Sequence, residues 1–293
     1  MIARSGFALA ALLLSVPTVA QEQPAEPSEI IVTGAREREQ QVREFVTALT
    51  HAPSGSIPRF IDQVCPLVVG LAPAQNEIVA ARLRTIAEAA GLQVAEPGCA
   101  PNAFVIVTRN KREFIETLAR RRPESFANLS PTQIRRLARS PGPAAAWQLE
   151  GLVDEDGTPL YVDQELGVLR NNSFSSASRI RTPTRSAFDA AAVVVEAGGL
   201  DGLTTIQLAD YAAMRLLAKV DPARLPPTAP ATILNVLTTP MGSPVPITMT
   251  NWDLAFLRGL YGAAPDLNIN GQRSEIGRLV RRELNAAAED DRD

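Results

Sequence analysis

The sequence predicts an α+β fold, a mixed sheet with flanking helices, and three observations lead to this prediction. An amphipathic helical pattern that begins at Pro73 lies between two short apolar segments of strand type, residues 64–71 and 104–107. Residues 144–195 carry further strand patterns, which are separated by turn residues. Residues 204–262 then return to helical periodicity. A helix between neighbouring strands is typical of a right-handed parallel crossover, and a hairpin in the later region adds antiparallel pairing.

The composition is that of an ordinary soluble globular protein, large enough to bury a sizeable core. The chain has 293 residues, of which 45% are hydrophobic and 21% are charged. Its formal net charge of −3 argues against a general binder of polyanions. We expect residues 41–293 to form a single α+β domain.

The N-terminal residues 1–20 have the pattern of a secretory signal peptide. Arg4 precedes an apolar run at residues 6–16, and small residues follow up to Ala20. This run is too short to span a bilayer, and no later segment has enough consecutive apolar residues to do so. We therefore expect cleavage near Ala20 and a periplasmic or secreted protein without a transmembrane segment in its mature chain.

The two cysteines of the chain, Cys65 and Cys99, stand at the beginnings of the two strand-like segments. In an oxidising compartment two cysteines most simply form a disulfide. A redox-active pair is the alternative, but the sequence has no C-x-x-C motif. We expect a structural disulfide that holds together the strand–helix–strand unit of residues 58–108. In the chain-entropy model, a loop of this size contributes about 3–4 kcal/mol of stability.

Residues 21–40 are polar and contain prolines near their start, which predicts a disordered leader. One apolar island in this leader resembles a segment near the mature N-terminus of TonB-dependent outer-membrane receptors. The island consists of Glu29, Ile30, Ile31, Val32 and Thr33. In those receptors the segment is an extended strand that adds to the sheet of a partner protein. The resemblance implies a docking strand for an envelope partner, and the alternative is a simple extended leader.

Residues 109–139 are helical in pattern and markedly basic, with few acidic residues between the cations. Ser130 and Gln133 form a capping-box pattern around Pro131, so a second helix should begin there. The cations are Arg109, Lys111, Arg112, Arg120, Arg121, Arg122, Arg135, Arg136 and Arg139. They form either a surface for phosphates or acidic headgroups, or a solvated helix face. No aromatic residues are interleaved for base stacking, so nucleic acid is not an expected partner.

The next region has β patterns. Residues 144–153 and 160–162 flank an acidic turn, which predicts a hairpin, and residues 186–195 predict another strand. Residues 163–178 read as an exposed loop. Asp154, Asp156 and Glu165 could suggest calcium, but the EF-hand spacing is absent, so we expect them to be turn acids.

Several segments resemble a group of exported proteins from alphaproteobacteria. They are IIVTG near the start, the pair VCPLVVGL and PGCAPN, and the helical segments QLADYAAMRLLA and WDLAFLRGLYG. This resemblance implies export and carries no particular activity.

Residues 204–262 also resemble, in their order of elements, the catalytic half of zincin metalloproteases of the metzincin kind. The last helix of those enzymes has the pattern T-x-W-D-x-x-x-x-x-x-L-Y-G. The matching positions here are Thr250, Trp252, Asp253, Leu260, Tyr261 and Gly262. The resemblance implies a zincin-like helical part over residues 204–285.

The chain departs from that family at the metal site. Where the active helix of a zincin has H-E-x-x-H, this sequence has Gln207-Leu208-Ala209-Asp210-Tyr211. Zinc proteolysis needs three protein ligands, a bound water and a carboxylate base. His51 is the only histidine and is remote in sequence. We therefore expect a degenerate scaffold with no metal or other cofactor.

Other catalytic arrangements find little support. A Ser-His-Asp triad would have to use His51, but the sequence has no G-x-S-x-G motif. The glycine loops that bind phosphate are also missing from the sequence. The sequence alone does not decide which carboxylates lie close enough for glycoside-type chemistry, and Asp210 and Glu196 are the pair that we single out. For Asp210 we favour the role of a structural hydrogen-bond acceptor. The favoured hypothesis is an exported, non-catalytic protein that binds or assembles with a cell-envelope partner. The alternative is a metal-independent carboxylate hydrolase that acts on envelope glycan or peptide.

Overall fold

The structure is a computed structural model that describes residues 28–50, 55–163, 165, 167, 169–170, 182–240 and 242–290. The chain divides into two compact units, residues 1–37 and residues 38–293. Residues 1–20, in which the signal peptide was predicted, lie outside the described residues, and so does His51.

The first helix corrects the predicted conformation of the leader. Helix α1, Ser28–Leu49, includes residues 29–33, so these residues are helical and not an extended strand. Residues 28–40 are accordingly not a disordered stretch, while residues 21–27 are outside the described residues. The physical reason is that prolines end at Pro27, and the residues after Gly34 are mostly good helix formers such as Ala, Arg, Glu and Gln.

Within the second unit, the later part of α1 has one apolar face. Val42, Phe45, Val46 and Leu49 recur at helical spacing and are all buried. The ring of Phe45 packs edge-on against Trp252, with centroids 5.4 Å apart. These contacts belong to the main core of the second unit.

The sheet is mixed, as the sequence predicted. Its strands are β1 (Arg59–Phe60), β2 (Pro66–Val69), β3 (Ala103–Thr108), β4 (Ala144–Asp154) and β7 (Thr184–Glu196). Strand β2 pairs in parallel with β3, and both β1 and β3 pair in parallel with β7. Strand β4 pairs with β7 in the antiparallel direction. The fold class is therefore α+β, with a mostly parallel sheet and flanking helices.

The predicted hairpin forms only at its tip. Strand β4 meets the following chain through one bridge between Val153 and Pro159, whereas its long ladder is formed with β7. The next short strands, β5 (Tyr161–Val162) and β6 (Leu169–Arg170), pair with each other. Strand β4 pairs with β7, and not with the short strand that follows it, because β7 is long enough to match β4 along its whole length.

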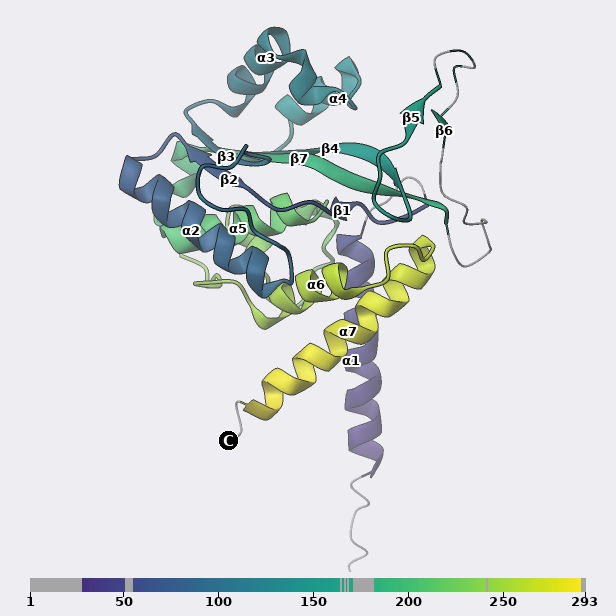
Figure 1. The fold of residues 1–293 in the computed structure, drawn as a ribbon. Helices are drawn as coiled ribbons and strands as arrows, with labels where there is room; N and C mark the ends of the chain where they lie inside the picture. Colours follow the sequence, from purple (N-terminus) through teal and green to yellow (C-terminus); the bar gives the residue numbers. More distant parts are fainter. Residues whose placement is uncertain are drawn as a thin grey trace, which may run out of the picture. The chain divides into compact units, whose positions relative to one another are not determined.

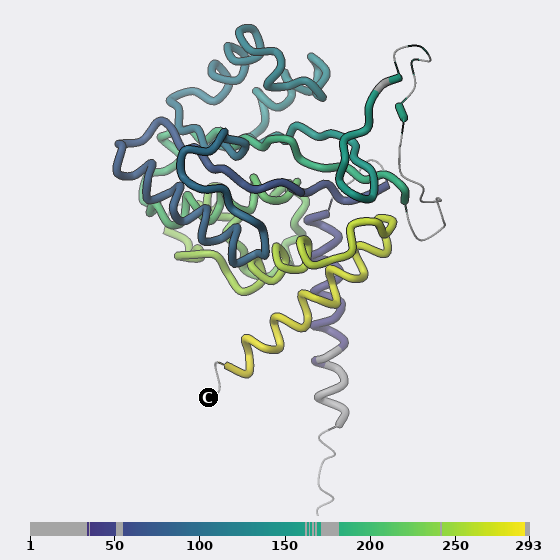
Figure 2. The backbone as a smooth tube through the Cα atoms, viewed as in Figure 1, coloured from purple at the N-terminus to yellow at the C-terminus, as the bar shows by residue number. Residues whose placement is uncertain are grey.

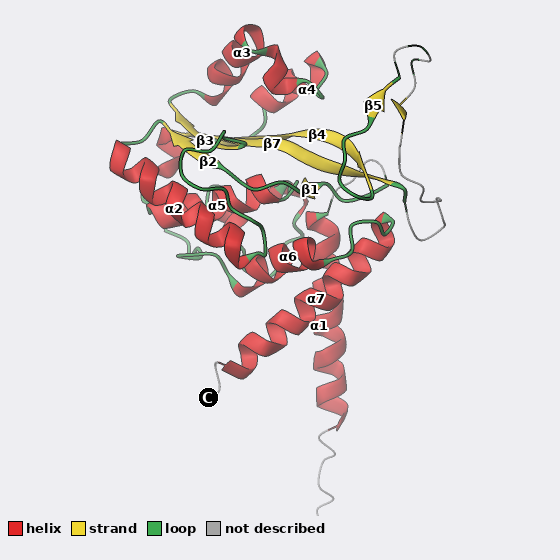
Figure 3. Ribbon diagram, viewed as in Figure 1, coloured by secondary structure: helices red, strands yellow, loops and turns green. Residues whose placement is uncertain are grey.

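Helices cover both faces of the sheet, which gives three layers (Figures 1 and 3). One face carries α2 (Pro73–Ala89), α5 (Thr205–Leu217) and α6 (Asn251–Gly262). The other carries α3 (Lys111–Arg121), the short helix η1 (Pro123–Phe126) and α4 (Pro131–Ala138). The predicted capping box of Ser130 and Gln133 begins α4. The basic segment therefore forms the outer helical layer.

Strand alternation divides the core between these layers. Ala103, Val105 and Val107 of β3 lie in the main core, while Phe104 and Ile106 pack on a smaller cluster below α3. The link from β2 to α2 is tight at Gly70, which has φ +100°. A Cβ at this position would lie 2.0 Å from the carbonyl oxygen of Val107, so only glycine fits there.

The predicted disulfide is present. Cys65 and Cys99 are bonded, with a Cα–Cα distance of 6.1 Å and a sequence separation of 34. Cys65 directly precedes β2, whereas Cys99 lies in the loop before β3. The side-chain oxygen of Asn102 accepts the N–H of Cys65 at 2.8 Å, and its amide group donates to Gln63. The bond therefore fixes the loop that leads into the central part of the sheet.

The C-terminal part is helical. Short turns of 3-10 helix, η2 (Ala197–Leu200), η3 (Pro222–Arg224) and η4 (Ile233–Asn235), connect the longer elements. Helix α7, Ile269–Asp290, lies beside α6 (Figure 2). In the part of the chain that the structure describes, no helix has the length and apolar character to cross a membrane.

Candidate functional site

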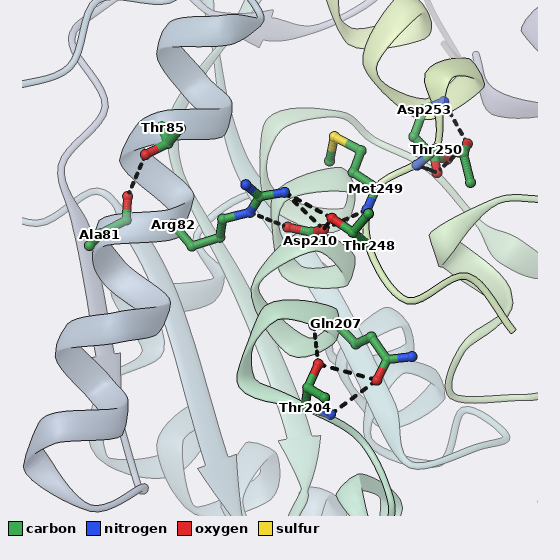
Figure 4. A network of polar contacts seen from close by, with 10 residues as sticks. All are labelled: Ala81, Arg82, Thr85, Thr204, Gln207, Asp210, Thr248, Met249, Thr250 and Asp253. Carbon is green, nitrogen blue, oxygen red and sulfur yellow. Dashed lines mark hydrogen bonds and ion pairs between the residues drawn. The ribbon is translucent and has the colours of Figure 1, made fainter. Parts of the chain in front are cut away.

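Asp210 lies on α5 and is the centre of a buried polar network (Figure 4). Its side chain is fully buried. The guanidinium of Arg82 donates to both carboxylate oxygens, at 2.7 and 3.2 Å. The hydroxyl of Thr248 donates at 2.7 Å, and the backbone N–H of Met249 donates as well. Three of these hydrogen bonds fall on Oδ2 and one on Oδ1, so Asp210 serves as a structural acceptor.

Glu196 has a different set of partners. It ends β7, and its side chain accepts the backbone N–H of Lys111 at 2.9 Å, where α3 begins. None of the described contacts of Glu196 is shared with Asp210. The carboxylate pair that the hydrolase hypothesis needs is therefore not brought together by any described interaction.

The other candidates from the sequence have structural partners too. Gln207 closes the capping box of α5 with Thr204 and donates to the carbonyl of Pro246. Asp154 accepts the backbone N–H groups of Asp156 and Thr158, as expected of a turn acid. Within the described ranges no group of three His, Cys, Asp or Glu side chains could hold a metal ion.

A cleft of about 880 Å³ lies elsewhere, along β4. Its lining comes from α4 and the loop after it, from β4 itself, and from the C-terminal end of α5 with the segment that follows. The volume falls in the range of roughly 300–1,000 Å³ that is usual for ligand sites. Residues distant in sequence thus meet along one strand.

Strand β4 is an edge of the sheet. Among the described residues, the only strand that pairs along its length is β7, and the opposite edge has the single bridge at Val153. The carbonyl of Pro143 accepts the N–H of Glu196 on the β7 side, and the carbonyl of Gln148 accepts from the side chain of Asn128 on the other side. Because backbone groups alternate along a strand, Ala144 and Ala146 direct their N–H and C=O groups to the cleft side with Gln148.

The wall of the cleft on the α5 side is polar. Gln148 donates through its side-chain amide to the carbonyl of Arg215 at 2.8 Å, which ties the end of α5 to β4. The ammonium of Lys219 pairs with Glu150. Arg215 donates to the hydroxyl of Tyr211 at 2.6 Å, and its guanidinium lies 5.6 Å from the centre of that ring. These contacts hold the two cations in place along the strand.

Burial raises the pKa of Tyr211, and the nearby Arg215 partly offsets this rise. The phenol is therefore neutral at physiological pH and acts as a hydrogen-bonding group. Cations dominate the cleft lining, with Arg136 and Arg139 on the α4 side and Arg215 and Lys219 on the α5 side.

Sequence reasoning did not find this cleft, although it found several of its parts. Arg136 and Arg139 belong to the basic segment, and the helix of Arg215 was predicted. The one local signal is the run of small residues at positions 144–146, which leaves space beside the strand. No family model, curated protein or solved structure matched the chain when it was compared with each of these sets.

Proposed function

We propose that this chain is an exported, non-catalytic protein that binds an extended peptide segment of a cell-envelope partner along β4. The observation that carries the proposal is the free edge of β4 at the bottom of a ligand-sized cleft. An exposed strand edge is a template for pairing with another chain. Such strand addition obtains affinity from main-chain hydrogen bonds and specificity from the pockets on either side.

The local geometry supports strand addition. The backbone groups of Ala144 and Ala146 point away from β7, and their small side chains leave room for a neighbouring backbone. The walls that α4 and α5 provide lie on the two sides of the sheet edge. An added strand directs its side chains alternately to the two faces of a sheet, so its side chains would meet both walls.

The polar networks support binding over hydrolysis. Asp210 accepts four hydrogen bonds, from Arg82, Thr248 and Met249. Glu196 is engaged by the backbone at the beginning of α3. The two carboxylates share no described contact, so they do not form the paired acid and base that such hydrolysis needs.

Two further observations support an exported protein on a protease-derived scaffold. The disulfide between Cys65 and Cys99 is typical of oxidising compartments outside the cytoplasm. The strand β7, the helix α5 and the capped helix α6 follow one another in the order that the metzincin resemblance implies. The capping box of α6 uses Thr250 and Asp253, two of the residues on which that resemblance rests.

The test uses peptides selected from a random displayed library on the full mature chain, with titration by fluorescence anisotropy. Ala146→Pro removes an N–H that points to the cleft and leaves the ladder to β7 intact. Ala146→Ser is the matched control, because it keeps that N–H. We expect the selected peptides to bind the wild type and Ala146→Ser equally, and Ala146→Pro about fivefold or more weakly, as the loss of one hydrogen bond and added steric hindrance require.

Two results would contradict the proposal. One is equal binding of the selected peptides to Ala146→Pro, which would place their site elsewhere. The other is failure of the library to yield any peptide that the wild type binds. Thermal unfolding of each variant, compared with that of the wild type, shows whether a loss of binding comes from the changed strand edge or from unfolding of the variant.

A further inference from the structure

We propose that the cleft selects acidic peptides, and that Arg215 receives a carboxylate from an Asp or Glu side chain of the bound strand. This inference rests on the proposed function, since it names the chemistry of the segment that pairs with β4. The observation behind it is a half-buried guanidinium in the cleft wall that hydrogen-bonds to Tyr211 but has no ion-pair partner among the described residues.

The head group of Arg215 is only partly satisfied. One terminal nitrogen donates to the hydroxyl of Tyr211 at 2.6 Å. The Nε atom is buried and has no hydrogen-bond partner within the described residues. Buried polar atoms in folded proteins nearly always have a partner, and a partly buried charge without a counter-ion is costly. A ligand carboxylate would supply the missing counter-charge.

The acids beside Arg215 are already engaged. Glu150 is paired with Lys219. Asp221 is exposed and accepts the backbone N–H of Ala223 at 3.1 Å, where it begins η3. No ion pair joins Arg215 to any carboxylate in the described part of the chain. The counter-ion is therefore expected from outside the chain.

The opposite wall has the same charge. Arg136 and Arg139 line the cleft from α4 and the residue after it, and both are exposed. Neither forms an ion pair with a carboxylate of the described segments, although Arg139 is one of the cations that lower the pKa of Glu116. Because side chains alternate along a strand, acidic residues at even positions would face one wall and those at odd positions the other. Guanidinium groups favour carboxylates, which they can bind through two parallel hydrogen bonds.

The position of Arg215 favours a side chain over a chain terminus. Gln148 holds the carbonyl of Arg215 next to the middle of β4, Ala144–Asp154. A strand that pairs with this part of β4 continues in both directions past Arg215. The group that reaches Arg215 is therefore a side-chain carboxylate.

The experiment compares two labelled peptides, acetyl-Thr-Glu-Thr-Glu-Thr-Glu-amide and the same peptide with Gln at every Glu. Blocked ends remove terminal charges, so the pair isolates the side-chain carboxylates. Each is titrated by fluorescence anisotropy against the mature wild type, Arg215→Gln, and Arg112→Gln as the control. Arg112 pairs with Glu116 on an exposed face of α3 and does not line the cleft.

We expect the wild type and Arg112→Gln to bind the Glu peptide at least about tenfold more tightly than the Gln peptide. Arg215→Gln should reduce this preference to a few-fold. Inorganic phosphate at equal ionic strength should displace neither peptide.

Equal affinity of the wild type for both peptides would overturn the inference, and so would an unchanged preference in Arg215→Gln. Displacement by phosphate would show a general anion site instead of an acidic-peptide site. If Arg215→Gln does not fold, the ratio of the wild type's affinities for the Glu and Gln peptides still tests whether the cleft prefers acidic peptides. Loss of binding in Ala146→Pro together with equal affinity for both peptides would contradict this inference and leave the proposed function standing.

Discussion

Helix α5 carries two charged groups, little more than one turn apart, in opposite situations. Asp210 is fully buried and accepts four hydrogen bonds. Arg215 is half-buried, has one described side-chain hydrogen bond, and leaves its Nε unpaired in the part of the chain described. The first group ties the scaffold together, whereas the second has donors left for a ligand. On this helix, a structural residue differs from a candidate binding residue mainly in whether its hydrogen-bonding groups already have partners within the protein, and less in its chemical type.

The scaffold role of Asp210 lies in what it joins. Through Arg82 it connects α5 to α2, and through Thr248 and Met249 it holds the segment that leads into α6. Asp253 makes a similar connection further along, where it accepts from Thr232, Ile233 and Thr250. Two buried carboxylates thus fix the irregular chain between α5 and α6.

The largest expected loss of stability comes from a change at Asp210. Asp210→Ala should lower the free energy of unfolding by about 3–5 kcal/mol, because it leaves Arg82 and two further donors without their acceptor. Arg215→Gln should change it by less than about 1 kcal/mol. Urea unfolding, followed by circular dichroism, measures both. Equal losses in the two variants would show that Arg215 is also a structural residue.

Removing the disulfide should have a slightly smaller effect. Reduction, or the double change Cys65→Ser and Cys99→Ser, should cost about 3–4 kcal/mol, since the closed loop restricts the unfolded chain. The peptide preference of the cleft should persist in the reduced protein below its unfolding midpoint, because the bond lies in the scaffold. An unfolding curve that does not move on reduction would show that the bond is not stabilising.

The smallest expected effect concerns pH. Burial raises the pKa of Tyr261, whose hydroxyl donates to the carbonyl of Leu217 at 2.6 Å. A tyrosine in the unfolded chain ionises near about pH 10, whereas the buried one stays neutral, so its contribution is complete below that pH and is lost as the pH rises above it. Tyr261→Phe should cost about 1 kcal/mol at pH 7 and make the alkaline loss of stability less steep.

Urea unfolding at pH 7 and at several values above pH 10 checks this expectation. Tyr211→Phe is a useful companion, because burial raises the pKa of Tyr211 also, but its partner is Arg215 in the cleft. An alkaline slope that is the same in Tyr261→Phe and the wild type would contradict the prediction.

Much of the scaffold could be predicted because its signals are local. Each of these signals depends on a few neighbouring residues: the apolar strand runs within residues 103–108 and 184–196, the helical periodicity of α2 and α5, and the capping boxes at Ser130 and Thr250. The disulfide followed from the cysteine count and the expected compartment. The helical conformation of residues 28–40 was missed, since charged and polar composition alone does not separate a disordered leader from a helix.

The cleft could not be predicted because tertiary pairing creates it. Whether β4 is an edge depends on its pairing with β7 and not with the short strand after its own turn. In the sequence, Arg215 is only the single cation of the helical segment QLADYAAMRLLA. Only the structure shows that Arg215 has no carboxylate partner among the described residues, because Gln148 bonds to its carbonyl and Glu150 is paired with Lys219.

The central claim is that an extended acidic peptide pairs with the free edge of β4. The most direct measurement is the dissociation constant of acetyl-Thr-Glu-Thr-Glu-Thr-Glu-amide for Ala146→Pro and for Ala146→Ser, two variants that differ in one outward N–H. The account predicts wild-type affinity in Ala146→Ser and binding about fivefold or more weaker in a folded Ala146→Pro. Equal affinity in the two variants would contradict it.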